Sequence, residues 1–112
     1  PYNAHTTASD ALWAGCPVLT APGATFAARV AGSLNHHLGL DALNASDDAA
    51  YTATAIRLGR DAAARAALRA ELAALRATSP LFDMRGCAGD FAALLQRMAQ
   101  RHRAGQLPAD LG

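Results

Sequence analysis

A histidine, two threonines and an aspartate lie close together near the start of the chain, in the stretch Asn3-Ala4-His5-Thr6-Thr7-Ala8-Ser9-Asp10. The apolar run of residues 11–14 follows, so this stretch is expected to lead into a helix. A helix N-terminus presents free N–H groups and the positive end of its dipole, and both favour a phosphate. Two hydroxyls and an imidazole beside it would add donors for a diphosphate, and the carboxylate of Asp10 would suit a ribose hydroxyl.

The same residues can also do no more than begin a helix. Thr6 or Thr7 can be the N-cap, with its hydroxyl accepting a hydrogen bond from a first-turn N–H. Thr7-x-x-Asp10 has the spacing of a capping box. Gly15 is then a natural helix stop, and Pro17 prevents continuation. Because capping boxes are common, spacing alone favours this plain structural interpretation.

Composition narrows the class of protein. The chain has 112 residues, of which 52% are hydrophobic and 17% charged, so we expect one globular domain at most. The net charge of +1 gives no case for binding nucleic acid or an acidic membrane surface. No apolar run is long enough to predict a membrane span. Cys16 and Cys87 fit buried thiols of a reducing compartment, which predicts a cytoplasmic protein.

The elements that must position the first stretch follow in α/β order. Residues 16–20 are expected to form a short buried strand, residues 21–23 a turn, and residues 25–34 a second helix. A loop over residues 35–40 and a very short strand at residues 41–43 are expected next. The two turns that precede the two helices should lie on one rim of a parallel sheet, where ligands of open α/β sheets bind.

Helices make up the rest of the expected fold. One opens at residues 46–48 and breaks or bends at Gly59; another begins at Asp61 and has Leu68, Leu72 and Leu75 on one stripe, with its arginines on a solvated face. Pro80 interrupts helicity, and a last helix starts at about Ala88. Residues 105–112 form a polar tail that we expect to be frayed.

The adjacent pair His36-His37 invites a metal interpretation. Neighbouring side chains point apart on a helix or strand, and no third ligand lies near in the sequence, so we expect no metal site.

The chain begins at Pro1, and its first residues have the pattern expected in the middle of a folded domain. A strand-to-helix turn needs a strand before it, and only Pro1 and Tyr2 precede the motif. We therefore expect a fragment of a longer protein. Its unpaired sheet edge would favour self-association of the isolated piece.

Five motifs, in their order along the chain, resemble one family. They are His5-Thr6-Thr7, Asp10, residues 12–18 (LWAGCPV), residues 22–31 (PGATFAARVA) and residues 79–83 (SPLFD). The chain is similar to the C-terminal end of the catalytic region of O-linked N-acetylglucosamine transferases and their bacterial and plant relatives, including SPINDLY-type fucosyltransferases. The resemblance runs from Asn3 to about Gly105. It is specific in its combination of motifs, because each motif alone is weak.

The resemblance implies an α/β fold: the C-terminal half of a Rossmann-like nucleotide-sugar-binding domain of a GT-B glycosyltransferase. We expect this part to be helix-rich, with two or three short parallel strands, over residues 1–104. In the parent, tetratricopeptide repeats would precede the catalytic region. The donor would be a nucleotide-diphosphate sugar such as UDP-GlcNAc, and the acceptors would be protein serine and threonine hydroxyls. No metal or other cofactor would be needed.

Residue by residue, the resemblance implies that His5, Thr6 and Thr7 contact the diphosphate of the donor and that Asp10 contacts its ribose. No catalytic residue can be assigned, because the family's lysine, base pocket and acceptor-side histidine come earlier in the sequence than Pro1. The isolated fragment should therefore be inactive. Two positions depart from the family pattern: Ala4 replaces a usual glycine, and Ala24 replaces a common glutamate.

Two alternatives stay open. The chain could be a non-catalytic interaction module that binds a partner through Leu68, Leu72 and Leu75. It could also serve the same chemistry with another donor, such as GDP-fucose.

Overall fold

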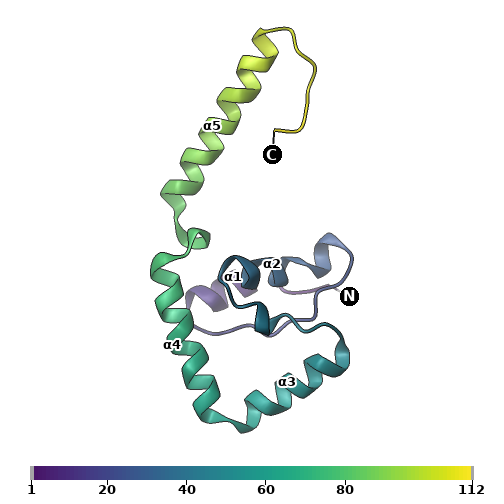
Figure 1. The fold of residues 1–112 in the computed structure, drawn as a ribbon, viewed down its shortest axis with the longest axis vertical. Helices are drawn as coiled ribbons and strands as arrows, with labels where there is room; N and C mark the ends of the chain where they lie inside the picture. The colour runs from purple at the N-terminus through teal and green to yellow at the C-terminus, as the bar shows by residue number, and fades with distance from the viewer. Residues whose placement is uncertain (1, 112) are drawn as a thin grey trace. The chain divides into compact units, whose positions relative to one another are not determined.

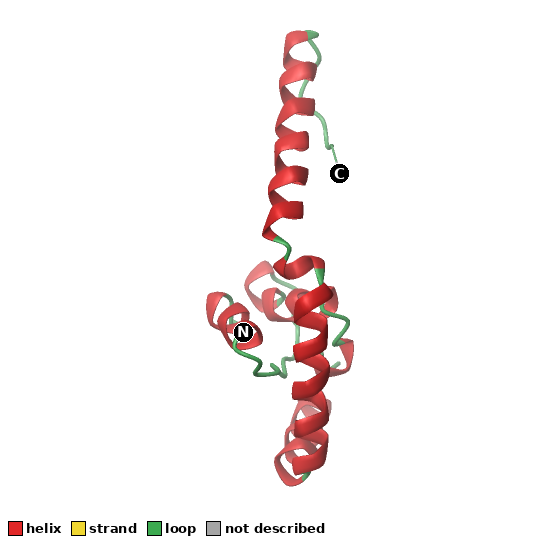
Figure 2. Ribbon diagram, turned by 90° about the vertical axis from the view of Figure 1, so that its left-hand side faces the viewer, coloured by secondary structure: helices red, strands yellow, loops and turns green. Residues whose placement is uncertain are grey.

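The structure is a computed structural model that describes residues 2–111, so Pro1 and Gly112, the outer ends of the expected domain and tail, lie outside the described residues. It is rich in helix (Figures 1 and 2). The chain divides into two compact units, Pro1–Phe82 and Asp83–Gly112. The α-helices are α1 Thr6–Trp13, α2 Val30–His37, α3 Asp48–Arg60, α4 Ala62–Thr78 and α5 Met84–Arg103, and three 3₁₀ helices lie at Phe26–Ala28 (η1), Asp41–Leu43 (η2) and Pro80–Phe82 (η3).

A small leucine core holds the first unit together. Its buried members come from α1, the end of α2, η2 and α4. They are Leu12, Leu38, Leu40, Leu43 and Leu72. Half-buried apolar side chains from the extended segment, α2, α3, α4 and η3 pack around them: Val18, Leu19, Leu34, Leu58, Leu68, Leu75, Leu81 and Phe82. Each fully buried leucine contributes about 1.5–3 kcal/mol relative to an exposed one.

The expected parallel strands do not form among residues 2–111. Residues 16–20 are extended, but their only ladder contact is an isolated parallel bridge between Thr20 and Asn44. Two backbone hydrogen bonds make it, from Thr20 N to Leu43 O at 3.0 Å and from Ala45 N to Thr20 O at 2.8 Å. The expected strand at Asp41–Leu43 is the 3₁₀ helix η2 instead. Pro17 brings no N–H to a ladder, which limits pairing along the segment.

Side-chain amides replace the missing ladder bonds. Asn35 is fully buried on α2, and its Nδ2 donates to Val18 O at 2.9 Å and to Asn44 Oδ1 at 3.0 Å. Asn44 in turn donates from Nδ2 to Gly32 O at 2.9 Å. This network ties the extended segment, α2 and the chain after η2 together. Asn35 Oδ1 has no partner among the described residues.

Helix ends follow sequence signals closely. Gly15 takes φ of 80°, and the bonds Gly15 N to Leu12 O and Cys16 N to Ala11 O form a Schellman motif, so the predicted stop of α1 is confirmed. Gly39 stops α2 in the same way. The helix ends at His37, three residues beyond the end expected at Leu34. Most of the expected loop at residues 35–40 is therefore helical or part of the helix cap.

Aspartates begin the later helices. Asp47, Asp61 and Asp83 each accept a hydrogen bond from the backbone N–H three residues on. The bond from Ala50 N holds the pKa of the Asp47 carboxyl below its usual range. Because Asp83 caps α5, that helix starts at Met84 rather than at Ala88. The break or bend expected at Gly59 falls one residue later, since α3 continues through Gly59 and ends at Arg60.

Two arginines of α4 are not merely solvated, contrary to the prediction. Arg65 donates from Nη1 to the carbonyls of Leu58 and Gly59, at 2.6 and 2.9 Å, and so caps the end of α3. Arg76 donates to Trp13 O at the end of α1 and lies over the indole ring, 4.9 Å from its centroid. Cations at helix C-termini complement the negative end of the dipole, which explains both contacts.

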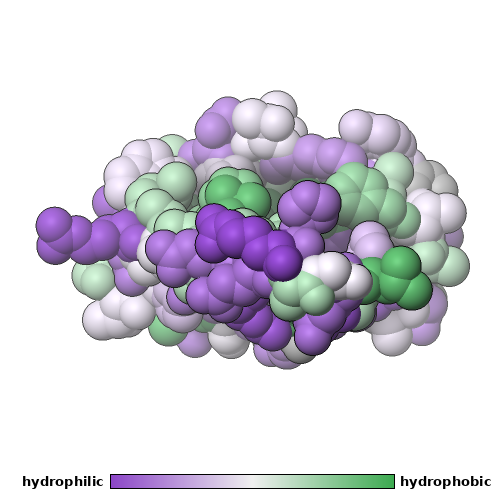
Figure 3. Space-filling view, turned by 90° about the horizontal axis from the view of Figure 1, so that it is seen from above, coloured by the Kyte–Doolittle hydropathy of each residue, from purple (hydrophilic) through white to green (hydrophobic). Residues whose placement is uncertain are grey.

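The second unit is one helix with an extended tail. No residue of α5 is buried, and its apolar side chains Phe91, Leu94, Leu95 and Met98 are exposed. On the face seen in Figure 3, apolar and hydrophilic side chains are interspersed. Within residues 2–111, no helix has both the length and the apolar character to cross a membrane. Arg101 donates to Leu107 O in the tail at 2.8 Å; fraying of that tail stays a prediction.

Gly32 is the close-packed point of α2, and its replacement gives a clear prediction. A Cβ on Gly32 would lie 2.6 Å from Pro22 Cγ and 3.6 Å from Asn44 Oδ1. Alanine gains about 1 kcal/mol of helix propensity, but overpacking costs about 1–3 kcal/mol. We expect Gly32→Ala to lower the free energy of unfolding in urea. Gly59→Ala is the matched control, because no atom lies within 4 Å of its added Cβ, and it should stabilise. Equal effects of the two substitutions would contradict the packing argument.

Candidate functional site

The start of α1 differs from the expected threonine cap. His5 holds the N-cap position, and no side chain caps the helix, so neither the Thr6 nor the Thr7 cap nor the capping box with Asp10 forms. His5 O accepts from the N–H groups of Ala8 and Ser9, at 3.0 and 3.2 Å. No described residue accepts a hydrogen bond from the backbone N–H of Thr6 or Thr7. These two N–H groups and both exposed hydroxyls are available to a ligand.

The imidazole of His5 is fixed against the loop that precedes α2. Its Nε2 lies 3.1 Å from Ala27 O. Tyr2 stacks on the ring with centroids 4.7 Å apart, and Phe26 meets it edge-on at 5.9 Å. A carbonyl oxygen only accepts, so Nε2 carries the proton, and in the neutral ring Nδ1 accepts from the Tyr2 hydroxyl at 3.5 Å. Nδ1 can donate to an anion only in the imidazolium form.

Asn3 joins the same two segments. Its backbone N–H donates to Ala27 O at 3.0 Å, and its side-chain Nδ2 donates to Ala21 O at 3.2 Å and to Ala28 O at 2.8 Å. Together with His5, Asn3 pulls the chain before α1 against residues 21–28. The predicted proximity of the two turns is therefore confirmed, whereas the parallel sheet expected to carry them does not form among residues 2–111. Sequence reasoning gave Asn3 no role, because its partners lie 18 and 25 residues away.

Asp10 lies one turn into α1, and its exposed carboxylate has no partner among the described residues. It follows Thr6 by four residues and Thr7 by three, so all three side chains share one face of the helix. The structure thus brings Thr6, Thr7 and Asp10 together on an exposed face, while the His5 ring is turned toward the neighbouring loop. This face can bind an anion at the helix start and a hydroxyl one turn away.

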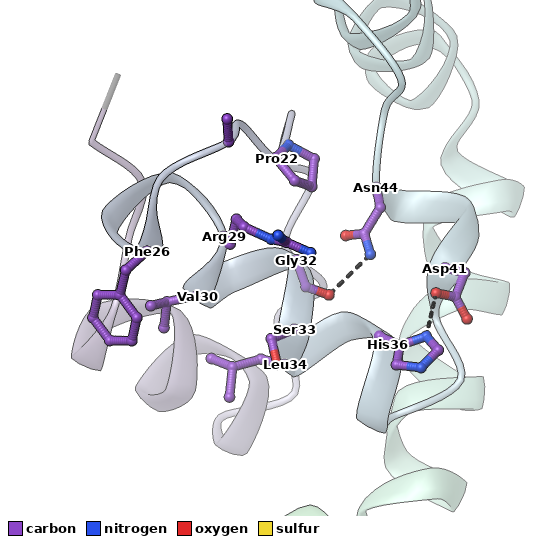
Figure 4. A pocket seen from close by; sticks show the side chains of 11 residues that line it. Pro22, Phe26, Arg29, Val30, Gly32, Ser33, Leu34, His36, Asp41 and Asn44 are labelled. Atoms are coloured by element: carbon purple, nitrogen blue, oxygen red, sulfur yellow. Dashed lines mark hydrogen bonds and ion pairs between the residues drawn. The ribbon is translucent and has the colours of Figure 1, made fainter.

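A hollow next to the loop is a feature that the sequence did not reveal. It is an open pocket of about 790 Å³, and Figure 4 shows its lining side chains. Phe26, Arg29, Val30, Ser33 and Leu34 line it from η1 and α2. Phe26 also contacts His5, so the pocket begins where the His5 side chain is held. The only sequence signal was the position of residues 22–29 after an extended segment, at the rim where α/β ligands bind.

The His36-His37 pair engages two different partners. His36 Nδ1 lies 2.8 Å from Asp41 Oδ1, and His37 Nδ1 lies 2.8 Å from Ser33 O. Within residues 2–111, no three histidine, cysteine, aspartate or glutamate side chains gather as a metal site. The two cysteines, Cys16 and Cys87, are exposed rather than buried fillers, which corrects the sequence interpretation.

Comparison with known proteins supplies a family and named relatives. Glycosyl transferase family 41 matches residues 2–91. The chain is 40% identical over 108 residues to a Caenorhabditis elegans UDP-N-acetylglucosamine–peptide N-acetylglucosaminyltransferase, covering 96% of this chain and 9% of that protein. It is 38% identical to the probable Arabidopsis thaliana enzyme of that name, SEC, and the match covers 95% of this chain and 11% of SEC. It is 31% identical to a probable Solanum lycopersicum enzyme of that name, SPINDLY, and the match covers 97% of this chain and 12% of SPINDLY. The chain thus spans about a tenth of the length of these relatives.

The hydrogen-bond partners of the histidines predict their tautomers. Neutral His5 should carry its proton on Nε2, because Ala27 O accepts there. His36 and His37 should carry theirs on Nδ1, because a carboxylate and a carbonyl accept there. Long-range proton–nitrogen NMR correlation at neutral pH distinguishes the two tautomers within one spectrum. A neutral His5 with its proton on Nδ1 would contradict the anchoring of its ring by the loop.

Proposed function

The chain belongs to glycosyl transferase family 41, and we propose that it supplies the donor-binding part of a longer enzyme. That enzyme would take a nucleotide-diphosphate sugar and transfer the sugar to serine or threonine hydroxyls of proteins. The printed names of the relatives, which are peptide N-acetylglucosaminyltransferases that use UDP-N-acetylglucosamine, support this class of reaction. The observation that carries the proposal is the exposed start of α1, where the N–H groups of Thr6 and Thr7 have no described acceptor.

For the architecture, we propose the C-terminal half of a Rossmann-like domain in a GT-B enzyme. The parallel bridge between Thr20 and Asn44 is consistent with the end of a parallel sheet. The side-by-side position of the two loops before α1 and α2 also supports it, because a parallel sheet brings such loops to one rim. In this proposal residues 1–104 belong to the donor domain, and the longer protein completes the sheet.

The donor would bind along the exposed face of α1. Its diphosphate accepts from the N–H and hydroxyl groups of Thr6 and Thr7, at the positive end of the helix dipole. Asp10, one turn further, accepts from a ribose hydroxyl. His5 would contact the same diphosphate, with its ring held in place by Ala27 O. The names of the relatives favour uridine and N-acetylglucosamine over the alternative donor GDP-fucose.

Stabilisation of the leaving diphosphate is the mechanistic role of this site. Negative charge accumulates on the diphosphate as the sugar departs, and donors held in place beforehand stabilise that charge most in the transition state. The hydrogen bonds of Asn3 and His5 to the loop fix the start of α1 before the donor arrives. Catalysis without a metal would leave all of this stabilisation to protein groups.

Burial of the leucines on α4 argues against the alternative that this helix binds a partner. Leu72 is fully buried, and Leu68 and Leu75 pack against the buried leucine cluster. That stripe therefore faces the core of the first unit and is not an exposed docking face. The proposal that remains for this chain is the donor site.

Substitutions in the longer enzyme test the donor site. We expect Asp10→Asn to weaken UDP binding by about tenfold or more, since a lost hydrogen bond to a charged group costs about 1.5–3 kcal/mol. His5→Ala should weaken binding and also lower kcat, because it removes the anchor that holds the start of α1 against the loop and one contact to the diphosphate. Isothermal titration with UDP and initial rates of transfer measure the two effects. Asp90→Asn, an exposed aspartate of α5, is the matched control. Unchanged binding in both site variants would refute the assignment.

Removal of divalent cations tests the absence of a metal requirement. We expect transfer by the longer enzyme to continue at an unchanged rate after treatment with EDTA. The reason is that amides, hydroxyls and the helix dipole would carry the phosphate charge. Initial rates with and without EDTA, and after adding back Mg²⁺ or Mn²⁺, measure this. Loss of transfer that Mn²⁺ restores would show that the charge is carried by a metal.

A further inference from the structure

The pocket beside η1 has an apolar floor and a single unpaired cation. Val30 and Leu34 are half-buried in it, and the ring of Phe26 is 81% exposed at its mouth. Its volume of about 790 Å³ is within the range of pockets that bind small ligands or peptide side chains. Neither the proposed donor contacts nor the leucine core accounts for this pocket.

Arg29 gives the pocket its charge. Its side chain is exposed, and no described residue forms an ion pair or a hydrogen bond with it. Figure 4 shows Arg29 beside Gly32, with Asn44 across from it and Phe26 on its other side. The one acid that lines the pocket, Asp41, is engaged by His36 at 2.8 Å. The Arg29 end of the pocket therefore suits an anionic group on an apolar stem.

The pocket and the proposed donor face share a wall. Ala27 and Phe26 belong to η1 and contact the His5 ring on one side, while Phe26 lines the pocket on the other. Whatever enters the pocket lies next to the group that would hold the donor diphosphate. The pocket is open to solvent rather than enclosed, which leaves room for a side chain of a passing polypeptide to enter.

We propose that this pocket is an acceptor subsite: it receives an acidic side chain of the polypeptide acceptor, whose carboxylate pairs with Arg29 while its methylenes cover Val30 and Leu34. The inference rests on the proposed function, because it takes the second substrate to be a polypeptide. Arg29 would then determine which serine or threonine segments are preferred. An exposed ion pair contributes about 0.2–1 kcal/mol, so the preference should be a few-fold rather than absolute.

The test compares matched peptides on the longer enzyme. A serine-containing acceptor peptide is made in versions that carry Glu, Gln or Lys at each flanking position in turn. We expect kcat/KM for the best Glu peptide to exceed that for its Gln version by about threefold to fivefold. Arg29→Gln should abolish this ratio, and Arg29→Glu should invert it in favour of Lys. Arg57→Gln, an exposed arginine of α3 with no described partner, should keep the ratio of the unaltered enzyme.

Direct binding separates failure of the inference from failure of the proposed function. Fluorescence anisotropy with labelled Glu and Gln peptides, in the presence of UDP, gives the same ratio without any transfer. If no peptide is glycosylated, the proposed function is refuted. The ratio of Glu-peptide to Gln-peptide affinity then still decides whether Arg29 favours an acidic side chain. If the Glu-to-Gln ratio is equal in the unaltered enzyme, Arg29→Gln and Arg57→Gln, the acceptor subsite is refuted even where UDP binds and transfer occurs.

Discussion

The relative positions of the segments in the first unit depend on the buried amide of Asn35. It joins the carbonyl of Val18 to the side chain of Asn44, which in turn holds the carbonyl of Gly32. A β-sheet would make such connections through its backbone, but here the single bridge between Thr20 and Asn44 supplies only two ladder bonds. Each net hydrogen bond contributes about 1 kcal/mol, while the unpaired Oδ1 of Asn35 costs about 1–3 kcal/mol. The network therefore adds little net stability, and its main effect is to fix where the segments lie.

That position is passed on to the candidate site through close contacts. Because Gly32 has no side chain, α2 can approach Pro22 at a distance that any Cβ would prevent. The loop after Pro22 is thereby held with its carbonyl groups directed toward the chain before α1. Ala27 O accepts both the backbone N–H of Asn3 and the ring of His5. The start of α1 is thus oriented by a loop more than twenty residues away, and the threonines need not orient it.

The sequence predicted the features that local chemistry controls. The stop of α1 was predictable because it depends only on a glycine, Gly15, at positive φ. The long helices were predictable because they depend on apolar periodicity and capping residues. The threonine cap was wrong because the competing contact, His5 with Ala27, spans 22 residues and leaves no local pattern. The strands were wrong for the same kind of reason, since pairing depends on partners elsewhere. The exposed face of Thr7 and Asp10 was predictable as a group, whereas the orientation of the His5 ring was not.

In the proposed donor site, the missing threonine cap would bear on function more than on stability. A side-chain cap typically contributes about 1 kcal/mol to a helix, and two threonines stand at the start of α1 without making one. Thr6 and Thr7 are exposed residues, so N–H groups without a protein partner cost far less there than they would in the core. A capping hydroxyl would occupy the donors that an anion needs, and it would have to leave before a phosphate could bind. Holding α1 through Asn3 and His5 keeps those donors free while the helix stays in place. Local rules are broken most often at functional positions, and this start of a helix fits that pattern.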